Sequence, residues 1–183
     1  PMTTAADSDA RTVQRAHGVG IVGLGVISGQ YLTTFRGRDD VAVVAVADLD
    51  VARAQAVARD IPGCRALSVA ELVSDPQVDT VLNLTIPAAH AEIALQAFAA
   101  GKNVYGEKPL AATMTEARQV VAAVPAGAWL GGAPDTVLGT GIQTARAAVD
   151  AGLIGRPVSA IATWISGGHE SWHPHPDFYY RPG

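Results

Sequence analysis

The chain has little of several features that mark special classes of protein. It contains one cysteine, Cys64, in 183 residues. A single cysteine excludes an intramolecular disulfide and is typical of a reducing compartment, so we expect a cytoplasmic protein. No apolar run approaches the roughly 20 residues that a membrane span requires. The formal net charge of −4 gives no basic surface for nucleic acid. We therefore expect neither a membrane nor a nucleic-acid partner.

The composition that remains indicates a globular protein. Apolar residues make up 49% of the chain and charged residues 16%, which is enough to build a core. Residues 1–17 are polar and lack the apolar core of a signal peptide, so we expect a disordered lead-in. Residues 18–152 are predicted to form one complete domain. Residues 153–183 are predicted to begin a second, incomplete domain. The tail of this segment, residues 166–183, is rich in Gly, Pro, His and aromatic residues.

Short apolar runs alternate with helical segments along residues 18–152. Val41–Ala47 is continuously apolar and rich in β-branched residues, which is typical of a strand buried on both faces of a parallel sheet. Thr113 and Glu116 have the spacing of a capping box that opens a helix. The alternation predicts an α/β fold with a doubly wound parallel sheet. Strands are predicted at residues 19–22, 41–47, 80–86, around 104, 128–131 and 158–165, and helices at 26–35, 51–59, 69–73, 88–100, 113–124 and 137–151.

A glycine turn follows the first predicted strand. Gly23 and Gly25 precede the first helix, where glycine permits the close backbone approach that a pyrophosphate needs at a helix N-terminus. Val26 and Ile27, at the start of that helix, belong to the same expected site. The strict G-x-G-x-x-G pattern has glycine at its sixth position, where this chain has Ser28. The turn alone is as compatible with a structural role as with nucleotide binding.

An acidic residue closes the second predicted strand. Asp48 lies 23 positions after Gly25, near the roughly 20 expected of a ribose-binding acid. A carboxylate there accepts hydrogen bonds from ribose hydroxyls and repels a 2′-phosphate, which favours NAD over NADP. Arg53 could neutralise such a phosphate, so NADP stays the alternative. Asp48 could instead cap the second helix, although Asp50 fits that role better.

The segment Glu107-Lys108-Pro109 carries an acid–base pair. Pro109 disfavours the α conformation for Lys108, so the lysine is held on an extended backbone directly after a short strand. A lysine ammonium fixed beside a carboxylate can donate or accept a proton. The alternative is an ordinary surface lysine in a loop between a strand and a helix.

Three segments of the chain together resemble the Gfo/Idh/MocA family of sugar and inositol oxidoreductases. They are Gly20–Gly25, Thr85–His90 with the pattern Thr-x-Pro-x-x-His, and Gly101–Pro109. The order and spacing match the N-terminal domain of that family over roughly residues 18–165. The resemblance implies a Rossmann domain that binds NAD, followed by an α/β domain with an open sheet. It also implies a small-molecule sugar or polyol substrate, and a homo-oligomer when the protein is full length.

The resemblance also implies roles for single residues. Lys108 would lie beside the nicotinamide and the reacting hydroxyl as the catalytic acid/base, in contact with both cofactor and substrate. Glu107 would help to place the cofactor, and Thr85 and Pro87 would line the nicotinamide side. His90 would lie at the start of the helix behind them. For Thr85 and Pro87 an ordinary strand end, and for His90 an ordinary helix histidine, stay open as alternatives.

Family members carry a further catalytic motif in the second domain, and this chain ends before any such motif. We therefore expect the 183 residues to be a fragment. The expected second-domain portion is one strand, residues 158–165, and a loop.

The aromatic and histidine-rich tail is a candidate substrate loop. Trp172 offers a flat apolar face for a sugar ring, while His169 and His173 offer hydrogen bonds to hydroxyls. Packing between two domains is an equally simple interpretation. His169, His173 and His175 also have plausible metal-ligand spacing, but the chemistry that the resemblance implies needs no metal, and we expect none.

Three functions are compatible with these residues and stand as hypotheses. The first is hydride transfer between NAD and a hydroxyl of a sugar, inositol or related polyol. The second is glycoside cleavage, in which transient oxidation by bound NAD enables elimination. The third is a regulatory protein that binds NAD without catalysis, which the intact Glu-Lys-Pro segment argues against.

Overall fold

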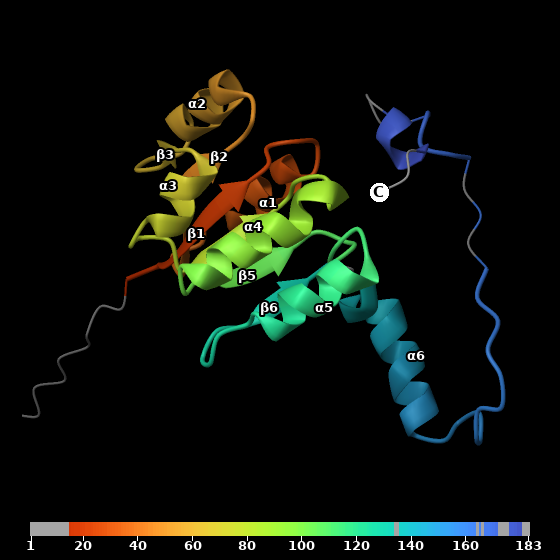
Figure 1. Cartoon of the computed structure of the whole chain (residues 1–183). Helices are drawn as coiled ribbons and strands as arrows, with labels where there is room; N and C mark the ends of the chain where they lie inside the picture. The colour runs from red at the N-terminus through yellow and green to blue at the C-terminus, as the bar shows by residue number, and fades with distance from the viewer. Residues whose placement is uncertain (1–14, 134–135, 164, 166, 172–175, 181–183) are drawn as a thin grey trace, which may run out of the picture.

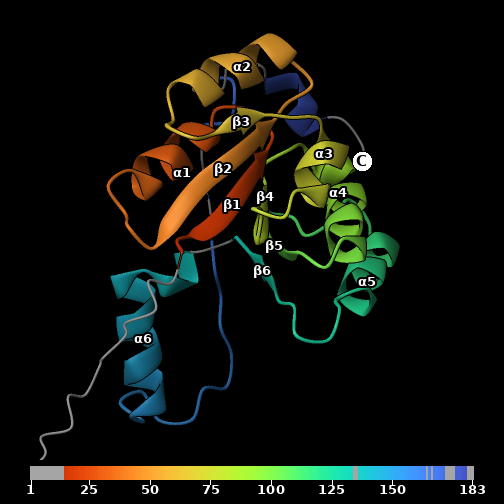
Figure 2. The same cartoon turned by 90° about the vertical axis from the view of Figure 1, so that its left-hand side faces the viewer.

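Six parallel strands form the centre of the protein. The computed structural model describes residues 15–133, 136–163, 165, 167–171 and 176–180. The strand order is β3-β2-β1-β4-β5-β6 (Figures 1 and 2). The order reverses between β1 and β4, which confirms the predicted doubly wound sheet. The strands are β1 (His17–Val22), β2 (Val41–Ala47), β3 (Arg65–Ala66), β4 (Thr80–Asn83), β5 (Asn103–Gly106) and β6 (Leu130–Gly132).

Helices cover both faces of the sheet. The α-helices are α1 (Ser28–Phe35), α2 (Val51–Arg59), α3 (Val69–Ser74), α4 (Pro87–Ala99), α5 (Met114–Ala122) and α6 (Thr140–Asp150), with short 3-10 helices at Thr136–Leu138 and Pro176–Tyr180. Side chains of α1 and α2 pack with Val19 and Ile21 of β1 on one face. Side chains of α3, α4 and α5 pack with Val22 on the other. Figure 2 shows the two layers on opposite sides of the sheet. Side chains of neighbouring β1 residues, such as Ile21 and Val22, therefore pack into cores on opposite faces of the sheet. Because both faces are buried, the strand is apolar without alternation.

Capping side chains mark the start of α2, α3 and α5. The Thr113 side chain accepts from the Glu116 N–H while the Glu116 carboxylate accepts from the Thr113 N–H, which confirms the predicted capping box. Ser68 and Glu71 form a second capping box at α3. Asp50 caps α2 by accepting from the Arg53 N–H at 3.1 Å. No helix among the described residues is both long and apolar enough to span a membrane.

The strand predicted at 158–165 is wrong for the described part of that segment. Residues 158–163 and 165 have no regular secondary structure, and Val158, Ile161 and Ile165 are 89%, 95% and 89% exposed. A strand is held by hydrogen bonds to a neighbour, and none of the six described strands lies beside this segment. β-Propensity alone therefore does not form a strand there.

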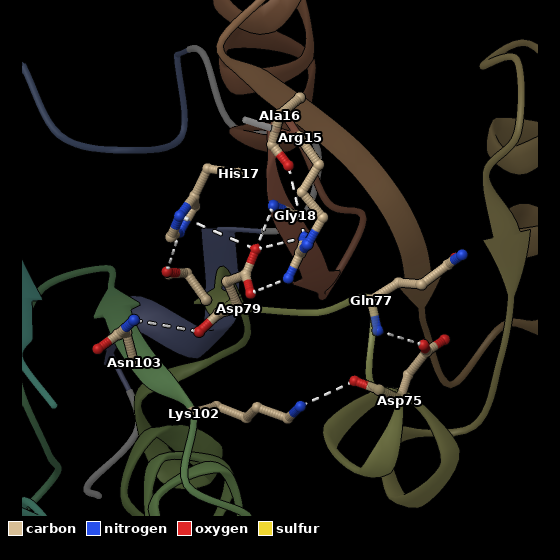
Figure 3. A network of polar contacts seen from close by, with 10 residues as sticks. Arg15, Ala16, His17, Gly18, Asp75, Gln77, Asp79, Lys102 and Asn103 are labelled. Carbon is tan, nitrogen blue, oxygen red and sulfur yellow. Dashed lines mark hydrogen bonds and ion pairs between the residues drawn. The ribbon is translucent and has the colours of Figure 1, made fainter. Parts of the chain in front are cut away.

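A polar network ties the first described residues to the amino edge of the sheet (Figure 3). Arg15 Nη1 donates to Asp79 Oδ2 at 2.8 Å, and the Gly18 N–H donates to the same oxygen at 2.7 Å. His17 begins β1, and its Nε2 lies 2.7 Å from Thr80 Oγ1. The predicted disordered lead-in, residues 1–17, therefore extends too far, because Arg15 is held by its ion pair with Asp79 and His17 belongs to β1. Residues 1–14 lie outside the described residues.

Replacing Asp79 by asparagine should lower the free energy of unfolding by about 1 kcal/mol at neutral pH. Partial burial raises the pKa of Asp79, but hydrogen bonds from Arg15 and the Gly18 N–H outweigh it, so the net pKa is lowered. A lowered folded-state pKa stabilises the protein above the unfolded-state pKa, and this stability is lost as the pH falls through the folded-state value. Urea unfolding should show the difference from wild type shrinking below about pH 4. Asp40→Asn, at an exposed pair with Arg38, is the control. An equal loss in both variants would contradict the role of Asp79.

Candidate active site at the carboxyl edge of the sheet

The predicted site residues meet at one edge of the sheet. Gly23 follows β1, Asp48 follows β2, Thr85 lies two residues after β4, and Glu107 follows β5. The carboxyl ends of parallel strands share an edge, and ligands of doubly wound sheets bind there, at the point where the strand order reverses. The topology therefore brings together four segments that span more than 80 residues of sequence.

The glycine turn combines a close backbone contact with open space. Gly23 has φ +91°, and a Cβ added there would lie 2.8 Å from the carbonyl carbon and oxygen of Leu84, so only glycine fits. A Cβ added at Gly25 would meet nothing within 4 Å. Ser28, at the sixth position of the pattern, is buried, and its Oγ donates to the Gly25 carbonyl at 2.7 Å. The serine thus closes the turn where the strict pattern has a third glycine.

The N-terminus of α1 is available to an anion. Ile27 is the N-cap residue of α1, and no side chain caps this end of the helix. Val26 and Ile27 beside it are 64% and 42% exposed. The Ser28 and Gln30 N–H groups donate to the carbonyls of Gly25 and Ile27, so a phosphate is favoured here chiefly by the helix dipole. The open space at Gly25 and this uncapped helix start fit a pyrophosphate.

Asp48 is held in a fixed orientation by the backbone around it. Its Oδ2 accepts from the Leu24 N–H in the glycine turn at 2.7 Å, and its Oδ1 accepts from the Asp50 N–H at 2.8 Å. Arg53 Nη1 lies 3.6 Å from Oδ1. Asp50, rather than Asp48, caps α2. The carboxylate of Asp48 is therefore oriented against the glycine turn, where a ribose-binding acid is expected.

The Glu107-Lys108-Pro109 turn is built from β5 outward. The Glu107 N–H donates to the Asn83 carbonyl at 2.9 Å, which extends the pairing of β4 and β5. Tyr31 Oη, from α1, donates to Glu107 Oε1 at 3.1 Å, and the Lys108 N–H donates to Oε2 at 3.2 Å. The Lys108–Pro109 peptide bond is cis. The turn is thus fixed from two sides while the Lys108 side chain is exposed.

A buried polar network lies behind this turn. Asn83 is 1% exposed; its Oδ1 accepts from Thr85 Oγ1 at 2.7 Å, and its Nδ2 donates to the His90 carbonyl at 3.1 Å. The His90 ring lies between the carbonyl oxygens of Pro109 and Thr85. Pro87 is the first residue of α4, a position at which proline costs no hydrogen bond. The network connects the turn after β4 to the turn after β5.

Two residues of the site were missed in the sequence. Tyr31, which contacts Glu107, lies 76 positions before it, and no local pattern connects the two. Asn83 had a signal, because it interrupts the apolar run Val81-Leu82-Asn83-Leu84. A polar side chain inside a buried strand needs hydrogen-bond partners and therefore marks a network.

The tail residues are only partly described. His169 lies beside Tyr180, with ring centroids 6.0 Å apart, and its N–H donates to Tyr180 Oη at 3.4 Å. Trp172 and His173, the other proposed substrate residues, lie outside the described residues, as does His175. Within the part of the chain that the structure describes, no group of three His, Cys, Asp or Glu side chains could hold a metal.

Burial raises the pKa of the Cys64 thiol to about 11, which keeps it protonated at neutral pH.

The strand order of the parallel sheet and the helices on both of its faces define a Rossmann-type α/β domain. The model of the Gfo/Idh/MocA family, an oxidoreductase family with an NAD-binding Rossmann fold, matches residues 17–127. The chain belongs to this family, as its three sequence segments predicted.

Similar proteins agree with this assignment. The chain is 44% identical over 99 residues to 1,5-anhydro-D-fructose reductase of Ensifer adhaerens, a match that covers 54% of the chain and 30% of the relative. It is 33% identical over 149 residues to inositol 2-dehydrogenase 3 of Saccharopolyspora erythraea, covering 78% of the chain and 43% of the relative. The structure of myo-inositol dehydrogenase from Lactobacillus casei with NAD(H) and myo-inositol superposes with a TM-score of 0.74 at 26% identity, covering 78% of the chain and 44% of that structure. The chain thus spans less than half the length of these proteins.

Proposed function

We propose that this chain is the cofactor-binding part of an oxidoreductase that transfers a hydride between NAD and a hydroxyl of a sugar, inositol or related polyol. The observation that carries the proposal is the position of Lys108. The fold presents its side chain at the same sheet edge as the glycine turn and Asp48, and Glu107 fixes its backbone. The names of the similar proteins, which include two inositol dehydrogenases and a sugar reductase, support the choice of substrate class.

Each part of the cofactor has residues that fit it. The backbone of Gly23 and Gly25 and the N-terminus of α1 would bind the pyrophosphate, with Val26 and Ile27 beside it. The Asp48 carboxylate would accept hydrogen bonds from the ribose hydroxyls. When bound, NAD supplies the hydride acceptor at nicotinamide C4.

The part of the site that would hold the nicotinamide ring, here called the nicotinamide side, is formed by the two turns after β4 and β5. Thr85 and Pro87 would line it from one turn, and Glu107 would place it from the other. His90 contacts the backbone of both turns, so it supports this side from behind.

Lys108 would move the proton that accompanies the hydride. In the oxidative direction, the neutral amine accepts the proton of the substrate O–H while the hydride leaves the carbon, and a carbonyl product remains. In the reductive direction, the ammonium returns the proton to the carbonyl oxygen. The Lys108 side chain is exposed, so its amine is open to a substrate.

The tail would contribute to substrate binding. His169 would donate to or accept from a hydroxyl, with Trp172 and His173 as further contacts. A homo-oligomer of the full-length protein and a cytoplasmic location also stay predictions.

Asp48 should set the preference for NAD over NADP. Asp48→Asn removes the charge that repels a 2′-phosphate and one of the two carboxylates beside Arg53, which lies 3.6 Å from Asp48 Oδ1 and 3.5 Å from Asp50 Oδ2, so the guanidinium can attract the phosphate. We expect the ratio of kcat/KM for NAD to that for NADP to fall at least about tenfold. Asp50→Asn is the matched control, because it also removes a carboxylate beside Arg53 but retains a good N-cap residue. Equal shifts in both variants would mean that Asp48 has no specific role.

A substrate panel tests the proposed function. The full-length protein is mixed with NAD and a set of inositols, sugars and sugar acids, and NADH absorbance is followed. Accumulation of NADH with one of these polyols is the expected result. Cleavage of a glycoside without release of NADH would replace net oxidation by oxidation–elimination. Binding of NAD with no turnover of any member of the panel would favour the regulatory hypothesis.

A further inference from the structure

Tyr31 connects the helix of the proposed cofactor site to the turn that carries Lys108. Helix α1 begins directly after the glycine turn, and Tyr31 lies one helical turn beyond its start. The Tyr31 Oη donates to Glu107 Oε1 at 3.1 Å. The other oxygen of this carboxylate, Oε2, accepts from the Lys108 N–H at 3.2 Å. A single carboxylate therefore links a side chain of α1 to the backbone of Lys108.

The alternation of β5 explains why this carboxylate faces α1. Side chains along a strand point alternately to the two faces of the sheet. Tyr105 of β5 packs into the core on the face that α1 and α2 cover. Glu107 lies two residues later, and its N–H donates to the Asn83 carbonyl at 2.9 Å, which continues the pairing of β4 and β5. The Glu107 side chain is therefore on the same face as Tyr105, where Tyr31 of α1 contacts it.

The ring of Tyr31 is packed between two other aromatic rings. Its centroid lies 6.5 Å from that of Tyr105, with the ring planes at 67°, and 6.4 Å from that of Phe35. Such aromatic contacts stabilise one orientation of the ring, so the hydroxyl points in a fixed direction. Glu107 itself is only half-buried. The Tyr31 hydroxyl therefore orients a carboxylate that could otherwise turn toward water.

We propose that Tyr31 is a positioning residue, whose hydroxyl holds Glu107, and through it the backbone of Lys108, at a fixed place relative to α1. The importance of this link for turnover rests on the proposed function, whereas the link itself rests on the two hydrogen bonds of Glu107. Without the hydroxyl, Glu107 can turn away from α1, and the Lys108 N–H then loses its acceptor. A misplacement of about 1 Å can lower a rate about 100-fold. The glycine turn keeps its structure, so the loss falls on turnover and not on cofactor affinity.

Hydrogen exchange tests the link without any turnover. Tyr31→Phe keeps the packed ring and removes only the hydroxyl. In the full-length protein, mass spectrometry follows amide exchange in the peptide that contains Glu107 and Lys108. We expect this peptide to exchange at least about threefold faster in Tyr31→Phe than in wild type, because the turn opens more often.

Thr34→Val is the matched control for the exchange measurement. It also removes a hydroxyl from α1, but this hydroxyl donates within the helix, to the Gln30 carbonyl at 2.9 Å. Exchange of the peptide with Glu107 and Lys108 should stay at the wild-type rate in this variant. Exchange in Tyr31→Phe that matches wild type or the control would overturn the link.

Kinetics with NAD and the polyol of highest turnover test the consequence of the link. Tyr31→Phe should lower kcat about 10- to 100-fold, while the Kd for NAD changes less than about threefold. Thr34→Val should leave both values unchanged. A kcat of Tyr31→Phe within about threefold of wild type, or a loss confined to NAD affinity, would overturn the positioning role.

A double-mutant cycle shows whether Tyr31 acts through Glu107. Glu107→Ala removes the acceptor, so adding Tyr31→Phe to it should change kcat less than about twofold. The same fold-loss from Tyr31→Phe with and without Glu107 would contradict the proposal. If the wild-type protein turns over no polyol, the proposed function fails, while hydrogen exchange still decides whether Tyr31 holds the Lys108 turn.

Discussion

Lys108→Met should lower the turnover of the full-length protein by about 10²- to 10⁴-fold, the range typical of losing a general acid or base. Methionine keeps an unbranched apolar side chain but cannot carry the proton. The Lys108 side chain is exposed, so the folded state loses little by the change. NADH absorbance measures turnover, and a titration of NAD measures its affinity, which should stay unchanged.

Lys102→Met is the matched control for this result. Lys102 Nζ donates to the Asp75 carbonyl at 2.8 Å at the amino edge of the sheet (Figure 3), so its loss affects folding and not the reaction. Turnover in the Lys108 variant close to that of wild type would refute its role as acid/base. Equal losses of turnover in both lysine variants would indicate that removing any positive charge lowers activity, and not that Lys108 has a specific role.

Gly23→Ala should have the largest effect on stability, lowering the free energy of unfolding by about 2–4 kcal/mol. A left-handed backbone at φ +91° is strained for alanine, and its Cβ would lie 2.8 Å from the Leu84 carbonyl group. Backbone atoms of a buried strand end cannot move aside as a flexible side chain can. Urea unfolding of the two proteins measures the difference.

Gly25→Ala separates cofactor binding from folding at the same turn. Because its Cβ would meet no atom within 4 Å, we expect stability to change by less than about 1 kcal/mol. The same Cβ would enter the space assigned to the pyrophosphate, so NAD affinity should fall at least about tenfold. Unchanged NAD affinity in this variant would place the cofactor elsewhere.

The strand and helix nearest the site were predictable because their signals are local. The observed β2 and α2, Val41–Ala47 and Val51–Arg59, have the predicted boundaries, since a continuous apolar run ends at Asp48 and Asp50 caps the helix after it. β3 was missed because two residues, Arg65–Ala66, make no periodic pattern. The helix predicted at 137–151 is divided at Gly139 into a 3-10 turn and α6. The strand predicted at 158–165 was wrong because a strand needs hydrogen bonds to a neighbouring strand, and the β-propensity of a sequence does not show whether such a neighbour exists.

The site shows the same division between local and distant signals. Gly23, Asp48 and Glu107 each follow a strand, so their positions in the sequence already predict that they share one edge. The contact of Tyr31 with Glu107 depends on how α1 packs against the sheet, where the Tyr31 and Tyr105 rings lie 6.5 Å apart, and it could not be predicted from spacing. For His90 the sequence left an ordinary helix histidine open, and the structure adds the two carbonyl oxygens at its ring.

We propose that a polyol and NAD bind at the carboxyl edge of this sheet and that a hydride passes from the polyol carbon to the nicotinamide. The most direct test follows the hydrogen itself. The full-length protein is given NAD and the polyol of highest turnover, deuterated at its carbon positions, and the reduced cofactor is analysed by mass spectrometry. We expect reduced cofactor that carries one deuterium on the nicotinamide ring. Reduced cofactor without deuterium, or no reduced cofactor with any polyol, would contradict it.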